Sequence, residues 1–211
     1  KLTLVNSLFD NNRAYGAGAI DNGGILEIIH SNFTNNRATK NGGAIDNNYV
    51  LNIVGSVFKS NVAGNEGGAI IARKDINMAY SSLFDNQASA GSALYINNGN
   101  SNFTGNWWGT NRPDFEKLLN LNVSDDFYWV TMEFRNSSKF IQYEDVGIEI
   151  SLQETVNSNG VVSKLASPEL LPTFKVSYNG DELDVNGGYL SKPITVPNKS
   201  SVSFALDNQS Y

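Results

Sequence analysis

The sequence predicts an all-β protein: a right-handed parallel β-helix of about four to five coils over residues 1–120, then an immunoglobulin-like β-sandwich over residues 121–211. Two observations lead to this prediction. A Ser-x-Phe phrase recurs through the first half at intervals of 24, 25 and 26 residues, and strand-like alternation of apolar and polar residues takes its place in the second half. A period in this range indicates stacked units, each of which buries its apolar face against its neighbours.

The residue types of the repeat select the kind of stack. Each copy runs from Ser-x-Phe through Asn-x-Ala to a small-small-Ala-aliphatic segment, as in Gly42-Gly-Ala44-Ile45. A leucine-rich repeat needs Leu at several fixed places, and helical repeats do not tolerate a Gly pair with many Asn residues. A parallel β-helix, with short strands joined by Gly- and Asn-rich corners, is the architecture that remains.

Stacked coils place like residues on like residues, about 4.8 Å apart. We therefore expect an internal aromatic stack and, at a corner, an amide ladder in which each side chain bonds to the next. Gly pairs are expected where the backbones of two coils come close. The predicted stack contains Phe9, Phe33, Phe58, Phe84 and Phe103, and the predicted ladder contains Asn12, Asn36, Asn61 and Asn86.

Two adjacent tryptophans, Trp107 and Trp108, follow the last repeat. The end of a β-helix exposes its core and must be covered, so we predict that both residues cap the stack. The alternative is a platform on which sugars stack, because paired aromatic residues suit such sites. Residues 113–119 begin with Pro and carry acidic residues early, which predicts one or two helical turns across the end of the stack.

The second half reads as a series of short strands separated by turns. Asn179-Gly180 and Asn186-Gly187 are hairpin signals. Six or seven strands in this length favour an immunoglobulin-like sandwich, although the Cys-Trp-Cys mark of antibody domains is absent. The predicted strands span residues 127–135, 146–153, 174–178, 182–185, 189–196 and 202–206.

Composition limits the classes of function. The chain has 211 residues, no Cys and a net charge of −6, which argues against nucleic acid as a partner. No apolar run is long enough to span a membrane. The chain starts inside a repeat without Met, so we expect it to be a piece of a longer protein. Four sequons are compatible with a glycosylated surface protein: Asn122, Asn136, Asn198 and Asn208.

The repeat Ser-x-Phe-x-x-Asn-x-Ala, followed by Gly-Gly-Ala-Ile, resembles the polymorphic outer-membrane-protein repeats of chlamydial surface proteins. The junction Asn106-Trp-Trp-Gly-Thr-Asn111, followed by Pro113, resembles more closely the adhesin-like proteins of methanogenic archaea. Those proteins combine a pectin-lyase-like β-helix with immunoglobulin-like modules. The resemblance covers residues 4 to about 130, and the remainder only in general style. It implies a large secreted or wall-anchored protein that attaches to other cells, and it offers no binding-residue motif to carry over.

The best candidates for chemistry are Asp21 and Asp46, which share a register and should stack on adjacent coils. They form a weak candidate site for a metal ion such as Ca²⁺; the alternative is two solvated surface carboxylates. Hydrolysis of a polysaccharide would need two or three carboxylates on one face, and no nucleophile–base constellation is visible. We therefore expect no catalytic residue, no cofactor and no firm metal site.

Tyr15, Tyr49 and Tyr95 fall at corners or outward positions and are the candidate ligand-binding residues. Together with the resemblance, the sequence predicts a fragment of an extracellular cell-surface adhesin. Its partner would be the surface of another cell, through a glycan or a protein, and many weak contacts would supply the attachment. The alternatives are a polysaccharide lyase or hydrolase, active or degenerate, and a passive surface stalk.

Overall fold

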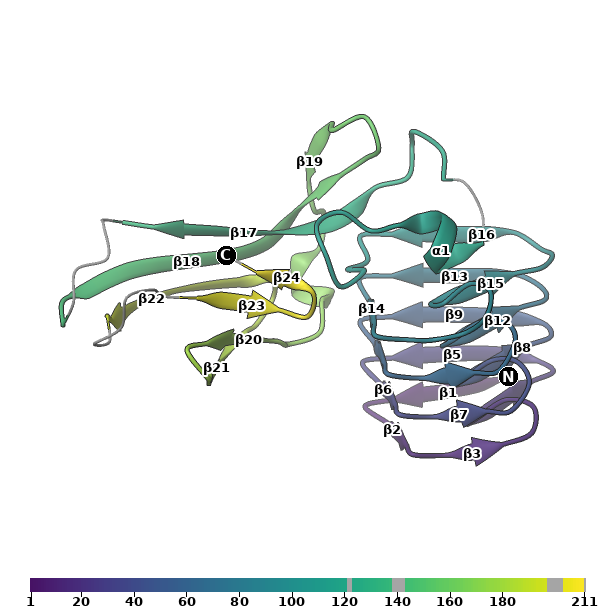
Figure 1. Cartoon of the computed structure of the whole chain (residues 1–211). Coiled ribbons are helices and arrows are strands. Elements are labelled where there is room, and N and C mark those ends of the chain that lie inside the picture. Colours follow the sequence, from purple (N-terminus) through teal and green to yellow (C-terminus); the bar gives the residue numbers. More distant parts are fainter. Residues whose placement is uncertain (121–122, 138–142, 197–202, 211) are drawn as a thin grey trace.

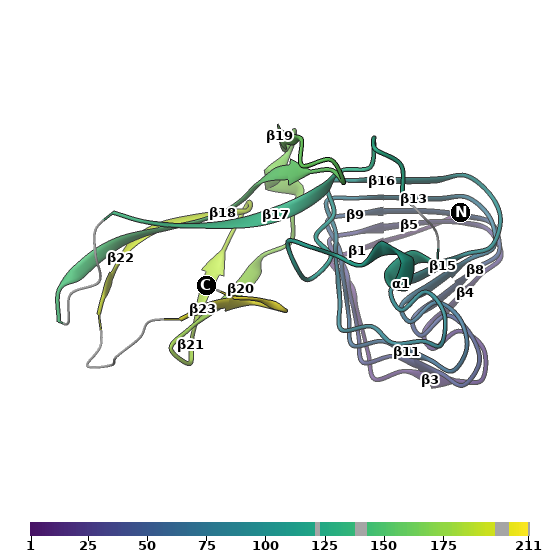
Figure 2. The ribbon, with the colours of Figure 1, turned by 45° about the horizontal axis from the view of Figure 1, so that its top comes forward.

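The computed structural model describes residues 1–120, 123–137, 143–196 and 203–210. A parallel β-solenoid of about four turns forms the first part, which confirms the predicted stack of coils (Figure 1). Antiparallel sheets form the second part and lie to one side of the solenoid's C-terminal end (Figure 2). They confirm an all-β second part, whereas its immunoglobulin-like topology stays a prediction.

The strands of successive coils form four parallel sheets, which follow one another around the solenoid. Sheet A contains β1 (Leu2–Val5), β5 (Ile25–Ile29), β9 (Val50–Val54), β13 (Ile76–Ala79) and β16 (Ser101–Thr104). Sheet B contains β2 (Leu8–Asp10), β6 (Asn32–Thr34), β10 (Val57–Lys59) and β14 (Ser82–Phe84). Sheet C contains β3 (Arg13–Ala14), β7 (Arg37–Ala38) and β11 (Val62–Ala63). Sheet D contains β4 (Ile20–Asn22), β8 (Ile45–Asn47), β12 (Ile70–Ala72) and β15 (Leu94–Ile96).

The predicted asparagine ladder runs along the corner between sheets B and C. Asn12 donates from Nδ2 to Oδ1 of Asn36 (2.9 Å), Asn36 to Asn61 (2.9 Å), and Asn61 to Asn86 (3.0 Å). Each Oδ1 also accepts the backbone N–H of the preceding ladder residue, as in Asn36 to Asn61 at 3.0 Å. Asn36 and Asn61 are fully buried, so these bonds replace the water that the amides lose.

A second ladder, which the sequence reading did not predict, runs between sheets A and B. The backbone N–H of Ser7 donates to Oγ of Ser31 (3.0 Å), and the same bond links Ser31 to Ser56 and Ser56 to Ser81. The residue before each rung has positive φ, where Gly, Asn and Asp are tolerated best. In the serine ladder these preceding residues are Asn6, His30, Gly55 and Tyr80. In the asparagine ladder they are Asn11, Asn35, Ser60 and Asp85.

Gly pairs lie where the predicted close approach of coils occurs. A Cβ atom on Gly43 would collide with the carbonyl oxygen of Gly68, and one on Gly18 with that of Gly43. A side chain at either position would force adjacent coils apart. The strand spacing of sheet D therefore depends on these glycines.

The aromatic stack is shorter than predicted. Phe9 stacks on Phe33 at 4.7 Å and Phe33 on Phe58 at 4.9 Å between ring centroids. Phe84 is not part of this stack. In the pairing of β14 with β10, Leu83 is the register partner of Phe58, and Phe84 is the register partner of Lys59. The ladder explains the correction: Ser81, and not Ser82, is the rung that follows Ser56 at a separation of 25 residues.

Phe103 also lies outside the predicted stack. Its strand, β16, belongs to sheet A, where Phe103 follows Met78 in register. The Ser101-Asn-Phe103 phrase therefore sits in a different strand of the coil from the other copies. The phenylalanine row instead continues through Leu83 to Trp108, since Trp107 pairs with Ser82 and its carbonyl accepts the N–H of Leu83.

The predicted helix is present as α1 (Phe115–Leu119), which lies across the end of the solenoid (Figure 1). Asp114 caps it by accepting the backbone N–H of Lys117 at 3.2 Å. Phe115 and Leu119 are buried in the solenoid core, and the Trp108 and Phe115 rings meet edge to face at 5.6 Å. The helix thus covers apolar surface that the last coil leaves open.

The second part, hereafter the C-terminal module, contains two sheets with a shared core. Sheet E contains β17 (Trp129–Asn136), β18 (Asp145–Val156), β19 (Val162–Lys164) and β22 (Tyr189–Thr195). Sheet F contains β20 (Phe174–Tyr178), β21 (Asp181–Val185), β23 (Phe204–Leu206) and β24 (Gln209–Ser210). A 3-10 turn, Pro168–Leu170, precedes sheet F. Asn179 and Gly180 have φ of 49° and 96°, as the predicted hairpin between β20 and β21 requires.

The corrected register makes a prediction about Leu83 and Phe84. Leu83 is fully buried in the solenoid core, so Leu83→Ala should lower the free energy of unfolding by about 2–5 kcal/mol. Phe84→Ala should cost less than about 1.5 kcal/mol, because the Phe84 ring lies outside that core, beneath the Lys59 ammonium. Urea denaturation of both variants measures the two costs. A larger cost for Phe84→Ala would show that the register is wrong.

Candidate functional site

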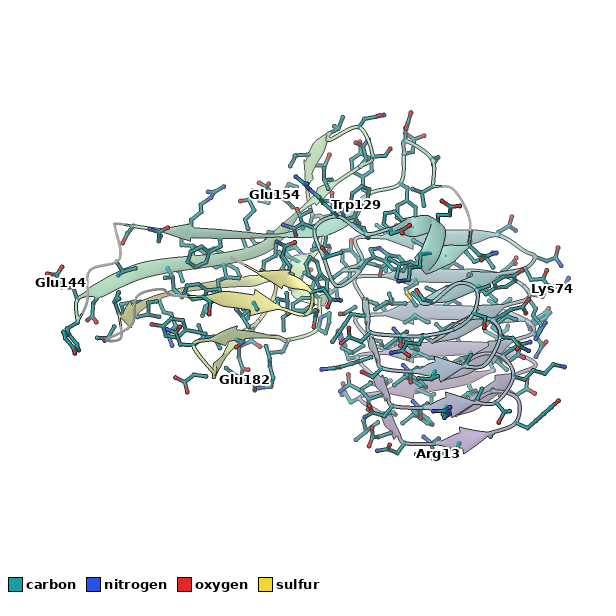
Figure 3. All side chains as sticks on the ribbon, in the orientation of Figure 1. Arg13, Lys74, Trp129, Glu144, Glu154 and Glu182 are labelled. Atoms are coloured by element: carbon teal, nitrogen blue, oxygen red, sulfur yellow. The ribbon has the colours of Figure 1, made fainter. Side chains whose placement is uncertain are left out.

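The six residues from Asn106 to Asn111 join the solenoid to the C-terminal module. Asn106 is the last rung of the serine ladder: its Oδ1 accepts the N–H of Ser81 (2.9 Å), and its Nδ2 donates to the Met78 carbonyl (3.0 Å). The backbone carbonyl of Asn106 then accepts the N–H of Val130 in β17 (2.9 Å). The first strand of the module is therefore paired to the last coil of the solenoid. In Figure 3, Trp129 marks the place where the ribbon passes from one part to the other.

The two tryptophans point into different cores. Trp108 ends the phenylalanine row and packs with Phe115 and Phe127, so it serves as the predicted cap. Trp107 does not cap the stack: it is fully buried in the core of the C-terminal module. Adjacent residues on a strand face opposite sides, which explains the split. Neither ring is exposed enough to act as a platform for sugars.

Asn111 closes the edge of β17 with its side chain. Its Nδ2 donates to the Met132 carbonyl (2.8 Å), and its Oδ1 accepts the Met132 N–H (2.7 Å). The carboxamide thus replaces one residue of a neighbouring strand. The Asn111 carbonyl accepts Nε1–H of Trp129 (3.1 Å), and its N–H donates to Oε1 of Gln209 (3.1 Å). This edge of sheet E is therefore satisfied by the connector itself.

Asp207 is the carboxylate most perturbed by the junction. Burial raises its pKa to about 6, although Nε1–H of Trp107 donates to its Oδ2 at 2.7 Å and, like nearby Lys59, opposes the rise. The next residue ties the same turn to the solenoid, since the Asn208 N–H donates to the Gly109 carbonyl (3.0 Å). Sequence reading did not single out Asp207, because its burial depends on the docking of the two parts.

A groove, hereafter the junction groove, begins between sheet B and the C-terminal module and continues over the corner after sheet B to the connector and α1. Three adjoining hollows of about 580, 440 and 740 Å³ form it. The first two share Val57 and Thr173, and the second and third share Asp85. Ligand sites form preferentially at such boundaries between domains. The groove is therefore a candidate ligand site at the boundary between the two parts.

Asp21 and Asp46 stack in register on β4 and β8, as predicted. Arg73 reaches over the row and binds Asp46 through Nε (2.9 Å) and a terminal nitrogen (3.1 Å), while Asn48 donates to Asp21 (2.9 Å). Because the Arg73 guanidinium already pairs with both oxygens of Asp46, this carboxylate is less available to a metal ion. Across the described part of the chain, His, Asp and Glu nowhere gather in groups of three or more that could hold a metal ion.

The three candidate tyrosines lie apart. Tyr15 and Tyr49 are exposed at corners (73% and 51%), whereas Tyr95 is half-buried on β15, in the row of Asp46 and Ile71. None of the ring contacts among the described residues joins any two of them. They do not form one aromatic site.

Two of the four sequon asparagines lie in the described residues. Asn136 is exposed at the end of β17. Asn208 is also exposed, but its Nδ2 contacts Oδ1 of Asp85 at 3.4 Å in the junction. Asn122 and Asn198 lie outside the described residues. Glycosylation stays a prediction for all four.

The outer face of sheet A is a regular surface that the C-terminal module leaves uncovered. One outward row holds Asn52, Asn77 and Asn102 on successive coils, and Asn77 donates to Oδ1 of Asn52 at 3.0 Å. Asn77 and Asn102 are exposed. The neighbouring outward row is mostly aliphatic: Val5, Ile29, Val54, Ala79 and Thr104.

Comparison with known families matches residues 30–48, within the second coil, to the repeat of the Chlamydia polymorphic membrane protein. This segment contains one Ser-x-Phe phrase, one ladder Asn and one Gly pair. No curated protein and no solved structure matches the chain. The match supports a β-solenoid repeat protein of the kind found on cell surfaces. Among the described residues, none of the helices has the length and apolarity that crossing a membrane requires.

The raised pKa of Asp207 predicts a pH dependence with a definite sign. A carboxyl group whose pKa is higher in the folded state than in the unfolded state destabilises the fold once it ionises. Its stabilising effect should therefore be complete below about pH 4 and lost as the pH rises through about 6. Asp207→Asn keeps an acceptor for Trp107 and removes the titration. Between pH 4 and pH 8, the free energy of unfolding of Asp207→Asn should rise relative to that of wild type by up to about 3 kcal/mol.

Urea denaturation of wild type and variant at several pH values measures this difference. Other carboxylates affect both proteins equally, so only the difference is diagnostic. Asp181→Asn, at an exposed hairpin position, is the matched control and should show no such trend. A difference that does not change with pH would contradict the buried environment of Asp207.

Proposed function

We propose that the chain is part of an extracellular adhesin that attaches its cell to other cells or to surface glycans. The outer face of sheet A is the observation that supports this proposal. It repeats the same outward positions on every coil, about 4.8 Å apart, with exposed amides beside aliphatic side chains. Such a face can make many equivalent weak contacts, whose joint effect far exceeds each one.

The construction of the solenoid suits this role. Two buried ladders hold the coils at a fixed pitch, so the positions of the outward side chains are set before a partner arrives. Preorganisation of this kind reduces the entropy lost on binding. The C-terminal module would then space the solenoid from the cell that carries it. The repeat match to a Chlamydia membrane protein is consistent with a place at the cell surface.

We further propose that the solenoid acts by binding and not by catalysis. The stacked pair Asp21 and Asp46 is the best carboxylate pair that the sequence offers, and Arg73 and Asn48 already engage it. A general acid needs a carboxyl group whose pKa burial has raised, close to a second carboxylate. Burial has raised the pKa of Asp207, and nearby Asp85 contributes to the rise, but Nε1–H of Trp107 already donates to Asp207 Oδ2 in the junction, away from the Asp21–Asp46 pair.

Retention of the purified chain on intact microbial cells tests the proposal. Asn77→Lys with Asn102→Lys places two long cations on the outer face of sheet A and should reduce retention about tenfold or more. Thr39→Lys with Asn65→Lys adds the same charge at exposed corners elsewhere and should leave retention within about twofold.

Release of reducing ends is followed in the same wells. Saturable retention without new ends supports an adhesin. New ends that disappear with Asp21→Ala or Asp46→Ala would replace the proposal with an enzyme. No retention on any cell would leave a passive stalk as the function of this chain.

A further inference from the structure

Two residues that line the junction groove each carry a buried polar atom without a partner in the described part of the chain. Ser82 Oγ and Trp108 Nε1 make no hydrogen bond to any of the described residues, although their side chains are only 1% and 3% exposed. Ser82 lines the 440 Å³ hollow, and Trp108 lines the 740 Å³ hollow. An unpaired buried donor is costly. Such groups are rare in native proteins and need a physical reason.

The charges along the groove constrain the ligand. Four cations line these two hollows, Lys59, Lys175, Arg112 and Lys117, and four acids oppose them, Asp85, Asp114, Glu182 and Asp207. A strongly charged ligand would therefore meet repulsion as well as attraction along its length. Amides and hydroxyls, such as those of Gln87 and Thr110, occupy places between the charges. This lining favours a neutral ligand with many hydroxyl groups.

An extended peptide fits the groove less well. Peptides commonly bind by adding a strand to a free sheet edge. The strands of sheet B pair with one another from coil to coil, so the groove meets their outward side chains and not a free backbone edge. The Asn111 side chain already occupies the nearby edge of β17.

We propose that the junction groove binds a neutral oligosaccharide chain, whose hydroxyl groups pair with Ser82 Oγ and Trp108 Nε1. A sugar hydroxyl both donates and accepts, so it satisfies either atom. Because both atoms are shielded from water in the free protein, pairing with a sugar requires the side chains above them to move aside. The site is separate from the outer face of sheet A, and it stands whether or not that face mediates attachment to cells.

Calorimetric titration with cellohexaose, mannohexaose and N-acetylchitohexaose tests the proposal, with hexagalacturonate as the anionic comparison. At least one neutral hexasaccharide should bind at a single site, more tightly than hexagalacturonate. Gln87→Trp fills the 740 Å³ hollow from an exposed position and should weaken that binding at least tenfold. Arg37→Trp, exposed in the row that continues through Val62 to Gln87, is the matched control and should bind as wild type does.

Ser82→Ala provides a second test of the site, which does not depend on filling the groove with a large side chain. It removes a buried hydroxyl with no partner, so the melting temperature should stay equal or rise, while affinity should fall about fivefold. Binding of none of the neutral sugars would overturn the proposal, as would a preference for hexagalacturonate. Undiminished affinity in a folded Gln87→Trp variant would also overturn it. Cell retention is measured separately, with the sheet A variants, so a negative result in one experiment does not affect the other proposal.

Discussion

The rest of the structure depends on the two ladders that pair each coil with the next. In both, a buried side-chain oxygen accepts a backbone N–H from the preceding coil, as Asn61 does for Asn36 and Ser56 does for Ser31. A buried amide without its partners costs several kcal/mol, so one residue of slip would leave a whole row unsatisfied. The ladders thus fix the register, and the register decides which residues stack inside and which face the solvent.

The same constraint explains how the solenoid ends. Asn106 takes the place of the next serine in the ladder, and the residues after it serve both parts of the molecule. Trp108 fills the solenoid core while Trp107 enters the other core. Because the connector is buried on both sides, the C-terminal module is docked directly on the stack. The junction groove, with its unpaired Ser82 and Trp108 atoms, is a consequence of this docking.

Much of the solenoid could be predicted from sequence, because stacking repeats the same local chemistry. The asparagine ladder and the close Gly approaches follow from the recurrence of the same residues in each copy, and the capping helix follows from Pro113 and the acidic residues after it. The Ser-x-Phe phrase at Ser82 predicts the wrong position for Phe84, whereas the constant step of five residues from rung Ser to rung Asn favours Ser81. Asp207 and the groove could not be predicted, since they arise where residues about 100 positions apart meet. Arg73 was missed because its long side chain crosses to Asp46 from outside the row.

The most direct test of the ladder is the free energy of unfolding of Asn61→Ala against Asn77→Ala. Asn61 accepts from Asn36, and its Nδ2 donates to Asn86 and to the Phe33 carbonyl, all within the buried core. Its loss leaves several buried groups unpaired and should cost at least about 3 kcal/mol. Asn77 lies in an exposed row with a single amide bond of the same kind, and its loss should cost less than about 0.5 kcal/mol. Equal costs would contradict the account, because the buried ladder would then contribute no more than a surface one.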